Sequence, residues 1–509
     1  MAGARGFPYS AVMALTLGDY HARSKHSLAS VRDAAHALDW DNQPLPFKIY
    51  PDLDGVPLPT DLPGSQRPAL ATLAPAAAPA QPVDRKTVAH LLYFSAGVLR
   101  TRRYPGGSVY YRAAACTGAL YHVDVYVVAA ALDGVEAGIW HFGPHDFALR
   151  RLRDGDHRAT LVAATGAESH VAQSPVSLVL TSTFWRNAWK YRTRTYRHVF
   201  WDAGTLLANL LAAAAALDVP AQVVTGFVDG AVERLLDLDP MREVPIAVVA
   251  IGDGVAPPPQ ASAPAPLGYA TLPLSREPLD YPILAEAHAA SSLDAPEAVR
   301  AWRARGAAPA LSSTPSAIRL EPLDPKAVQQ PIEAVIVRRG SARRFSHAPI
   351  PRAALATVVH AAAAPAPLDA HAPSICYLIA NAVDDLASGA YVVGTDGGLT
   401  ALREGDFRRE AGFLGLGQEL PADAAVALYW LVDLDEVFAR LGDRGYRVAQ
   451  LEAAIAGGRT YLAAYALGLG ATGLTFFDDD VTTFFSPHAA GKSVMFHMAI
   501  GRHVRRAGT

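Results

Sequence analysis

Four arginines and a serine lie within one short stretch in the second half of the chain. The stretch runs Arg338-Arg339-Gly340-Ser341-Ala342-Arg343-Arg344-Phe345. A guanidinium can bind two phosphate oxygens at once and a serine hydroxyl adds a short donor, so this set suits a phosphate monoester. A solvated basic surface would have the same composition, and composition alone does not separate the two interpretations.

A second stretch, in the first half, combines a lysine and a tyrosine with aromatic neighbours. Trp189-Lys190-Tyr191 lies in a segment that also contains Arg186, Arg192 and Arg194. A lysine acts as a base only in its neutral form, which burial and nearby cations favour, and a tyrosine can relay or orient the proton. The structural alternative is an amphipathic basic and aromatic surface with no catalytic role.

A turn of small residues, also in the first half, precedes a predicted strand. It runs Cys116-Thr117-Gly118-Ala119-Leu120-Tyr121 and is followed by His122. Small residues let the backbone approach a flat ring closely, although a tight turn made for packing would contain the same residues. Cys116 and His122 lie six residues apart and no orienting third group is evident. We therefore interpret their proximity as incidental and assign the pair no role in nucleophilic catalysis.

These stretches belong to a chain that contains one pattern twice. The segment 126–252 recurs at 377–501 with an offset of about 250 residues, so that Ala250-Ile251-Gly252 corresponds to Ala499-Ile500-Gly501. This offset exceeds the period of solenoids and propellers and indicates two fused domains. A fused pair imitates a two-fold dimer but is free to lose one of its two equivalent sites. The arginine-rich stretch occurs only in the second copy and the lysine–tyrosine pair only in the first, so we predict one composite site.

The order of elements within each copy predicts an α+β fold. Strands are expected at 123–130 and 375–382, at 138–142 and 389–393, and at 176–183 and 424–432. A long helix follows from Tyr196 or Tyr446, and Asp84 is expected to cap a helix that runs to about Leu99. Strands and helices alternate without strict βαβ regularity, which favours α+β over α/β.

Shifts in composition divide the chain into four parts. We expect an N-terminal arm at 1–85, a first domain at 86–252, a Pro- and Ala-rich linker at 253–331 and a second domain at 332–509. The linker contains Pro257-Pro258-Pro259, and Asp294 to Glu297 predicts a capped helix over 298–305.

The bulk composition excludes several classes of protein. In 509 residues, Lys and Arg total 45 and Asp and Glu total 48, so no overall field favours nucleic acid or an anionic membrane. The two cysteines, Cys116 and Cys376, are too few for a disulfide scaffold and lack metal-ligand spacing. We therefore expect a cytoplasmic protein without a metal site, nucleic-acid partner or membrane segment.

Several of these motifs together resemble a known family. Arg339-x-Ser341-x-Arg343 with Phe345 and the turn at 349–351, and the turn at 117–121, are similar to the flavin-binding pattern of the nitroreductase superfamily. The segments 20–27, 39–40 and 47–51 and the Lys190-Tyr191 pair resemble, more closely, its SagB/ThcOx branch. These are the azoline dehydrogenases of thiazole- and oxazole-modified peptide pathways. The chain departs from the branch at Cys116, His122 and Asp124, where Ser, Pro and Glu are common.

The resemblance implies tandem nitroreductase-like domains that form an intramolecular pseudo-dimer and bind FMN between them. By this resemblance Lys190 and Tyr191 are catalytic. The implied FMN-binding residues are Arg339, Ser341 and Arg343 at the phosphate, Thr117, Gly118 and Ala119 at the ring, Lys492 as a further phosphate ligand, and Thr472 and Gly473 at the border of the ring.

The function that this resemblance implies is oxidation of azolines to azoles in a ribosomally made peptide, with dioxygen reoxidising the flavin. A cyclodehydratase partner would make the azoline substrate. Two alternatives stay open at this point, namely another FMN-dependent oxidation or nitroreduction of a small metabolite, and a non-catalytic scaffold of a biosynthetic complex. Further dimerisation of the internal pseudo-dimer also stays open.

Overall fold

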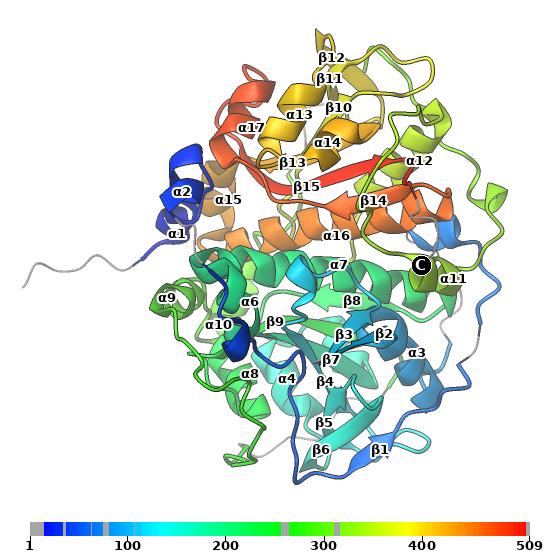
Figure 1. Cartoon of the computed structure of the whole chain (residues 1–509). Coiled ribbons are helices and arrows are strands. Elements are labelled where there is room, and N and C mark those ends of the chain that lie inside the picture. Colours follow the sequence, from blue (N-terminus) through cyan, green and yellow to red (C-terminus); the bar gives the residue numbers. More distant parts are fainter. Residues whose placement is uncertain are drawn as a thin grey trace, which may run out of the picture.

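Two β-sheets lie on either side of a central pair of long helices (Figure 1). The computed structural model describes residues 15–33, 37–62, 64–74, 81–105, 107–255, 264–309 and 316–504. Pro257-Pro258-Pro259 of the predicted linker lies outside the described residues.

Strands and helices follow one another along the whole of the described chain. The strands are β1 (Gly55–Pro57), β2 (Val98–Tyr104), β3 (Gly107–Arg112), β4 (Val123–Ala129), β5 (Gly138–Gly143), β6 (Ala148–Asp154), β7 (Val176–Thr183), β8 (Ala221–Val224), β9 (Glu243–Ile251), β10 (Ile375–Ala380), β11 (Gly389–Val393), β12 (Leu399–Glu404), β13 (Val426–Val432), β14 (Gly470–Gly473) and β15 (Ser493–Gly501). The α-helices are α1 (Leu17–Arg23), α2 (Leu28–Asp33), α3 (Arg85–Ala96), α4 (Arg158–Ala164), α5 (Ser169–Gln173), α6 (Phe184–Tyr191), α7 (Thr195–Ala216), α8 (Asp229–Leu236), α9 (Pro282–Ala290), α10 (Pro296–Arg303), α11 (Ile332–Arg338), α12 (Arg352–Ala363), α13 (Arg408–Leu414), α14 (Glu419–Asp423), α15 (Leu434–Leu441), α16 (Arg444–Ala466) and α17 (Asp478–Phe485). The short 3-10 turns are η1 (Trp40–Asn42), η2 (Ala69–Thr72), η3 (Thr117–Ala119), η4 (Arg192–Arg194) and η5 (Pro325–Ala327).

The two sheets have the same topology, which confirms the predicted α+β fold and its internal repeat. The first sheet has the order β1-β6-β5-β4-β7-β9-β8 and the second has the order β12-β11-β10-β13-β15-β14. Apart from the added edge strand β1, the two orders match strand for strand. Neighbouring strands pair antiparallel throughout both sheets.

Most predicted strands are present, but the prediction missed elements in the connectors. The strand expected at 176–183 is β7, and those expected at 123–130 and 375–382 end one and two residues earlier than expected. The helix expected to run to about Leu99 ends instead at Ala96, because Gly97 takes an extended conformation as its C-cap. From Val98 the chain enters a separate two-stranded ribbon, β2–β3, which the sequence pattern did not predict.

The long helices α7 and α16 pack directly against each other at the centre of the molecule (Figure 1). Glycines allow this close approach. A Cβ placed on Gly204 of α7 would lie 2.5 Å from the Cβ of Ala454 in α16, and one placed on Gly458 would collide with Ala208 in the same way. Gly204 and Ala454 are counterparts at the repeat offset, and so are Ala208 and Gly458. Because each residue contacts its own counterpart, the two helices cross at the internal two-fold axis of the chain.

A buried carboxylate of the second half is held by arginines of the first half. Asp478, at the start of α17, is 3% exposed and lies 2.5 Å from an Nη atom of Arg197 and 3.0 Å from one of Arg194. Burial alone would raise the pKa of Asp478, but the two guanidiniums outweigh it and hold that pKa below its ordinary value. Arg197 also donates to the Ser24 hydroxyl, so the ion pair anchors the segment that follows α1.

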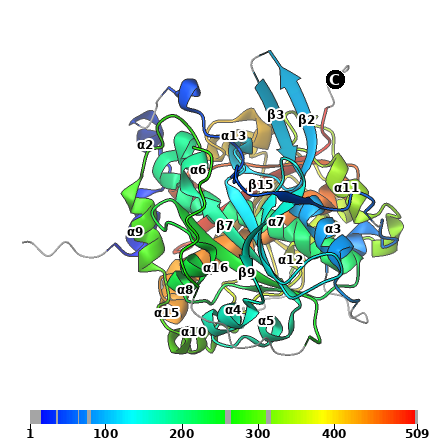
Figure 2. The same cartoon turned by 90° about the horizontal axis from the view of Figure 1, so that it is seen from below.

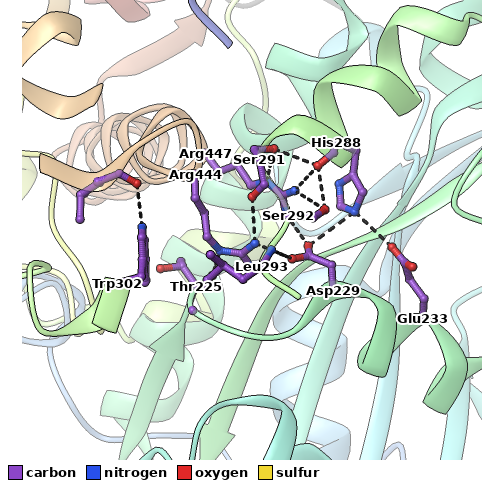
Figure 3. Close-up of polar contacts among 12 residues, drawn as sticks. Thr225, Asp229, Glu233, His288, Ser291, Ser292, Leu293, Trp302, Arg444 and Arg447 are labelled. Carbon is purple, nitrogen blue, oxygen red and sulfur yellow. Dashed lines mark hydrogen bonds and ion pairs between the residues drawn. The ribbon is translucent and has the colours of Figure 1, made fainter. Parts of the chain in front are cut away.

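The equivalent arrangement in the other half holds a carboxylate of the first half between arginines of the second (Figure 3). Asp229, at the start of α8, lies 2.6 Å from Arg444 and 2.7 Å from Arg447. Arg447 donates to the Ser291 hydroxyl after α9, as Arg197 donates to Ser24 after α1. The two halves are therefore locked by a reciprocal pair of buried ion networks.

These contacts change the interpretation of the predicted linker. Helix α9, which the sequence analysis did not predict, occupies in the second network the place that α1 of the arm occupies in the first. The helix expected over 298–305 is present as α10, with Pro296 in its first turn. This part of the linker is therefore a packed counterpart of the arm, whereas the bounds of the four parts of the chain stay a prediction.

One described stretch, Phe184–Ala216, is long and apolar enough to cross a membrane by length and composition. It comprises α6, η4 and α7, and 94% of its most apolar window is buried inside the protein. Burial of this degree is typical of a core helix.

We expect Asp478→Asn to destabilise the whole chain, because it leaves Arg194 and Arg197 buried without a counter-charge. The loss should be about 3–5 kcal/mol of unfolding free energy in urea denaturation at neutral pH. The lowered pKa means that the stabilisation is present above the ordinary carboxyl pKa of 3.8 and is lost as the pH falls toward the folded value. The difference between wild type and variant should therefore shrink in acid.

Asp479→Asn is the matched control for this prediction. Its side chain is 77% exposed and pairs with Lys25 at the surface, so its loss should change stability little. Equal destabilisation by the two variants would contradict the assigned role of Asp478.

Candidate active site

A large cavity lies between the two halves and is lined by both. Its volume is about 1230 Å³. The first half contributes five of the predicted site residues to its walls, and the second half contributes another five. These residues are Thr117, Gly118, Ala119, Lys190 and Tyr191 from the first half and Arg339, Ser341, Arg343, Thr472 and Gly473 from the second.

Lys492 is the one predicted site residue that does not line this cavity. It precedes β15, and its backbone carbonyl accepts a hydrogen bond from the Thr482 hydroxyl of α17. Gly473 pairs with Met498 of the same strand, six residues after Lys492. A strand advances about 3.3 Å per residue, so Lys492 lies about 20 Å along the strand from this pairing, and its phosphate contact stays a prediction.

Arg339 and Ser341 form one polar end of the cavity. Nε and one Nη of Arg339 donate to the Ala113 carbonyl of the first half at 3.1 and 2.9 Å, which fixes the guanidinium across the domain junction. The Ser341 hydroxyl lies 3.2 Å from the Tyr461 hydroxyl, which also accepts a 2.6 Å hydrogen bond from the Gly473 amide. Tyr461 therefore connects the arginine-rich loop to the turn at Thr472 and Gly473.

Asp202 of α7 organises the small-residue turn. Its carboxylate accepts from the backbone amide of Thr117 at 2.9 Å and from the Thr117 hydroxyl at 2.7 Å. It also accepts from the Cys116 thiol at 3.0 Å and lies 2.8 Å from Nε2 of His122. One buried side chain thereby fixes the turn that faces the cavity.

The same contacts bear on the chemistry of Cys116. Burial raises the pKa of its thiol well above the ordinary value, and the charge of Asp202 raises it further. Cys116 is therefore a protonated hydrogen-bond donor and not a thiolate nucleophile. Cys116, His122 and Asp202 offer ligand atoms within 4.8 Å of one another. Because these atoms already bond to one another, we interpret the cluster as a hydrogen-bond network.

Gly118 lies directly against Tyr191. Its φ of +62° is in the left-handed region, and a Cβ placed there would lie 2.9 Å from the Tyr191 hydroxyl oxygen. Glycine at this position therefore satisfies both the backbone conformation and the close approach of the phenol. The contact brings the predicted ring-binding turn and a predicted catalytic residue to the same point of the cavity wall.

The arm positions the helix that ends in Lys190 and Tyr191. Trp189 donates its indole N–H to the Asp39 carbonyl at 2.9 Å, and its ring packs edge-on against Trp40 at 5.2 Å. Lys190 follows at once and is partly buried, with its Nζ 5.4 Å from the Tyr191 ring centre. The lysine has no hydrogen bond or ion pair with any described side chain or backbone group.

The expected crowding of cations around Lys190 is only partly present. Arg186 is fully buried and pairs with Asp124 at 2.8 Å, and Arg194 pairs with Asp478. Both charges are therefore balanced by carboxylates and directed away from the lysine. These arginines are close to Lys190 in the sequence, but successive residues of a helix point in different directions, so closeness in sequence does not bring their side chains to the lysine.

Tyr191 stays a neutral phenol at neutral pH. Burial raises its pKa, and the nearby Asp202 carboxylate and Cys116 thiol raise it further, while the Arg343 guanidinium lowers it. A protonated phenol beside the cavity can donate a hydrogen bond or relay a proton, but it is not itself the base.

His198 offers a buried acceptor that the sequence analysis did not identify. It is 1% exposed, and burial lowers its pKa well below the ordinary value, so the ring is neutral. Its Nδ1 lies 2.9 Å from the amide oxygen of Asn187, which makes Nδ1 the donor and Nε2 an acceptor. Nε2 has no partner among the described residues, although the ring lines the cavity beside Tyr191.

These features fit the FMN that the resemblance implies. Arg339, Arg343 and Ser341 are the donors a phosphate monoester needs, and the turn at Gly118 presents backbone without side chain toward the same cavity. A buried acceptor without a partner, as at His198, is typical of a site completed by a ligand. Pockets for one small molecule are about 300–1,000 Å³, so the cavity has room for a cofactor and part of a substrate.

The equivalent position on the opposite side of the molecule is filled by the chain itself. Thr225 corresponds at the repeat offset to Thr475, which lines the open cavity. The Asp369 carboxylate accepts hydrogen bonds from the Thr225 amide and hydroxyl and from the Gly226 amide. Arg303 binds the same carboxylate, and the Trp302 ring packs directly over Gly226. The described chain therefore contains one open composite site and one closed counterpart.

A smaller cavity of about 290 Å³ remains near the closed counterpart. Its Arg67 forms an ion pair with Asp218, and its Arg459 donates to backbone carbonyls of 364 and 365. Arg67 is therefore balanced by a carboxylate, whereas Arg339 and Arg343 of the open cavity form no ion pair with a carboxylate of the described chain.

Tyr461 and Asp202 were missed because they lie in the two long helices, in which no site residue was predicted. A signal was nevertheless present, since Tyr461 of α16 corresponds to Leu211 of α7 at the repeat offset. A polar residue in one copy and an apolar one in the other marks a position where the two copies differ in role. Asp202 corresponds to Glu452, which similarly binds the Ala372 amide, so it gave no such signal.

We expect Gly118→Ala to disturb both the backbone and the Tyr191 contact. Alanine in the left-handed region costs about 1–2 kcal/mol, and the added Cβ also displaces the phenol. Gly397→Ala is the matched control, because Gly397 has φ +75° but nothing within 4 Å of its Cβ position. Urea denaturation should show a loss in both variants, whereas bound flavin per chain should fall only in Gly118→Ala. Equal flavin content in the two variants would contradict the role of this contact.

Comparison with known proteins agrees with this geometry. The nitroreductase family model matches residues 78–253 and 336–502. A solved structure from Anabaena variabilis, described as a nitroreductase, is 25% identical and superposes with a TM-score of 0.76, covering 96% of this chain and 99% of its own.

Two curated relatives match shorter parts of the chain. MJ1384 of Methanocaldococcus jannaschii, named as a nitroreductase, is 23% identical over 171 residues, which are 34% of this chain and 81% of the relative. The microcin B17-processing protein McbC of Escherichia coli is 26% identical over 157 residues, which are 30% of this chain and 54% of McbC. Because one family model matches both copies of the fold, over more than half of the sequence, the chain belongs to the nitroreductase family.

Proposed function

We propose that this protein is an FMN-dependent dehydrogenase that oxidises azoline rings to azoles in a ribosomally made peptide. The observation that carries the proposal is the meeting of Lys190 and Tyr191 with Gly118, Arg339 and Ser341 around one cavity. The lysine–tyrosine pair is the part that resembles azoline dehydrogenases, and the others form a site suited to FMN.

Aromatising an azoline removes a proton from one ring carbon and a hydride from its neighbour. FMN, when bound, supplies the acceptor for the hydride, and dioxygen takes the two electrons in turn. Lys190 takes the proton, since its side chain lines the cavity and has no partner among the described groups. Tyr191, a neutral phenol, holds the lysine by the contact of its ring with the lysine Nζ at 5.4 Å and orients the azoline by hydrogen bonding.

The relative McbC supports a peptide substrate, because its name assigns it to the processing of microcin B17. The match covers about half of McbC, so the substrate and partners of this chain are part of the proposal. We further propose that a cyclodehydratase of the same pathway supplies the azoline. Reduction of a small nitro compound, which the name of MJ1384 suggests, is the alternative that the activity assay tests.

We expect purified or reconstituted protein to bind close to one FMN per chain, as measured by visible absorbance after release of the cofactor. Arg339→Ala should lower flavin affinity by about ten-fold or more, because a charge-assisted contact to phosphate contributes roughly 1.5–3 kcal/mol. Arg344→Ala is the control, since Arg344 belongs to the same arginine-rich stretch and is exposed but does not line the cavity. Two FMN per chain would contradict the closed counterpart site, and no binding would exclude the FMN enzyme.

We expect Lys190→Ala to lower the rate of azoline oxidation by about 10²–10⁴-fold, the usual contribution of a general base, while flavin content stays near that of wild type. Tyr191→Phe should give a smaller loss. The assay follows loss of two hydrogens from an azoline-containing peptide by mass spectrometry. Arg192→Ala, on the same turn but outside the cavity wall, should retain activity. Efficient nitro reduction without azoline oxidation would favour the alternative.

A further inference from the structure

The cavity carries far more positive charge than one flavin phosphate requires. Seven cationic side chains line it, against one acidic residue, Asp202. The seven are Arg100, Arg102, Arg112, Lys190, Arg338, Arg339 and Arg343. The whole chain has a formal charge of -3, so this excess is local and needs its own explanation.

None of these seven side chains forms an ion pair with a carboxylate of the described chain. Arg112 is buried and donates to the carbonyls of Pro46 and Val123, which ties it to the arm. Arg338 donates to Gln330 and to the Tyr465 carbonyl. The arginines of the second half and the buried Arg112 therefore belong to the framework or to the phosphate end, which leaves the two of strand β2 unexplained.

Arg100 and Arg102 project from the ribbon β2–β3, which extends from the body of the molecule (Figure 2). Residues two apart on a strand share a face, so both arginines point to the side that contributes to the cavity wall. Arg100 also lies over the Tyr111 ring of β3 at 4.5 Å, which holds its guanidinium on that face. Arg103 is equally exposed but lies on the opposite face and does not line the cavity.

The shape of this surface suits an extended chain better than a compact anion. Arg100 and Arg102 lie two residues apart on β2, about 7 Å along the strand, so they continue the cavity wall along a line. A two-stranded ribbon also has edges with unpaired backbone groups, which extended peptides can bind as an added strand. Two arginines at alternate positions beside such an edge complement carboxylates at alternate positions of a peptide.

We propose that the Arg100–Arg102 face of the ribbon binds an acidic segment of the peptide substrate and directs its reacting ring into the cavity. This inference rests on the proposed function for the identity of the substrate as a peptide. It adds that the segment flanking the modified ring carries glutamate or aspartate, and it places the recognition of that segment on β2 and not on the phosphate-binding loop.

The test measures binding without turnover, so it is separate from the test of azoline oxidation. FMN-reconstituted protein is titrated against a fluorescein-labelled peptide of alternating glutamate and glycine, with fluorescence anisotropy as the readout. The matching lysine–glycine peptide serves as the ligand control. We expect the acidic peptide to bind and the basic one not to bind, with an affinity that falls as salt is raised.

The double variant Arg100→Glu/Arg102→Glu is compared with the single variant Arg103→Glu. The comparison distinguishes binding by the cavity-facing arginines from non-specific attraction to the positive charge of the ribbon. Reversing both cavity-facing arginines should weaken acidic-peptide binding by about ten-fold or more while flavin content stays unchanged. Reversing Arg103 should weaken binding only slightly. Equal effects of the two variants, or equal binding of both peptides, would overturn the proposal. So would competition by NADPH with an affinity that depends on Arg100 and Arg102, which would assign the face to a nucleotide.

Discussion

Two carboxylates, each buried between two arginines of the opposite half, are the interactions on which the rest of this structure depends. Asp478 pairs with Arg194 and Arg197, and Asp229 pairs with Arg444 and Arg447. Burying charge is costly, and an ion pair of this kind adds less net stability than apolar packing would, but losing one partner leaves an uncompensated charge inside the protein. The halves are therefore bound to one relative placement, and the open cavity exists because that placement is fixed.

The two-fold relation creates two equivalent positions for a site, and differences in sequence between the halves leave one open and the other closed. Gly118 leaves space for Tyr191 in the open site, whereas on the opposite side the Asp369 carboxylate binds the amides of Thr225 and Gly226. Trp302 then covers Gly226. A flat cofactor needs backbone without side chains, so the Asp369 carboxylate and the Trp302 ring close a site that the fold would otherwise repeat.

The arm and the linker share a role that neither composition nor periodicity revealed. Helices α1 and α9 present a serine hydroxyl and a histidine carbonyl to equivalent arginines. The arm further supports Trp189, and through it Lys190, by the contacts of Asp39 and Trp40. Segments that look like connectors in the sequence thus position the proposed catalytic lysine and complete the junction, which explains why the resemblance extends to the arm.

The sequence by itself determined the repeat, the α+β class and most strands, because these follow from local patterns and recognisable motifs. Of the eleven site residues predicted from the sequence, ten line one cavity. The sequence grouped Lys492 with them, which the structure does not, and it gave no sign of the ribbon β2–β3, of Asp202 as the anchor of the turn, or of His198 and its unpaired nitrogen. Only the tertiary structure decided these points. Hydrogen-bond partners, burial and the direction of a side chain depend on residues that are hundreds of positions apart in the sequence. A local sequence pattern contains no information about such partners.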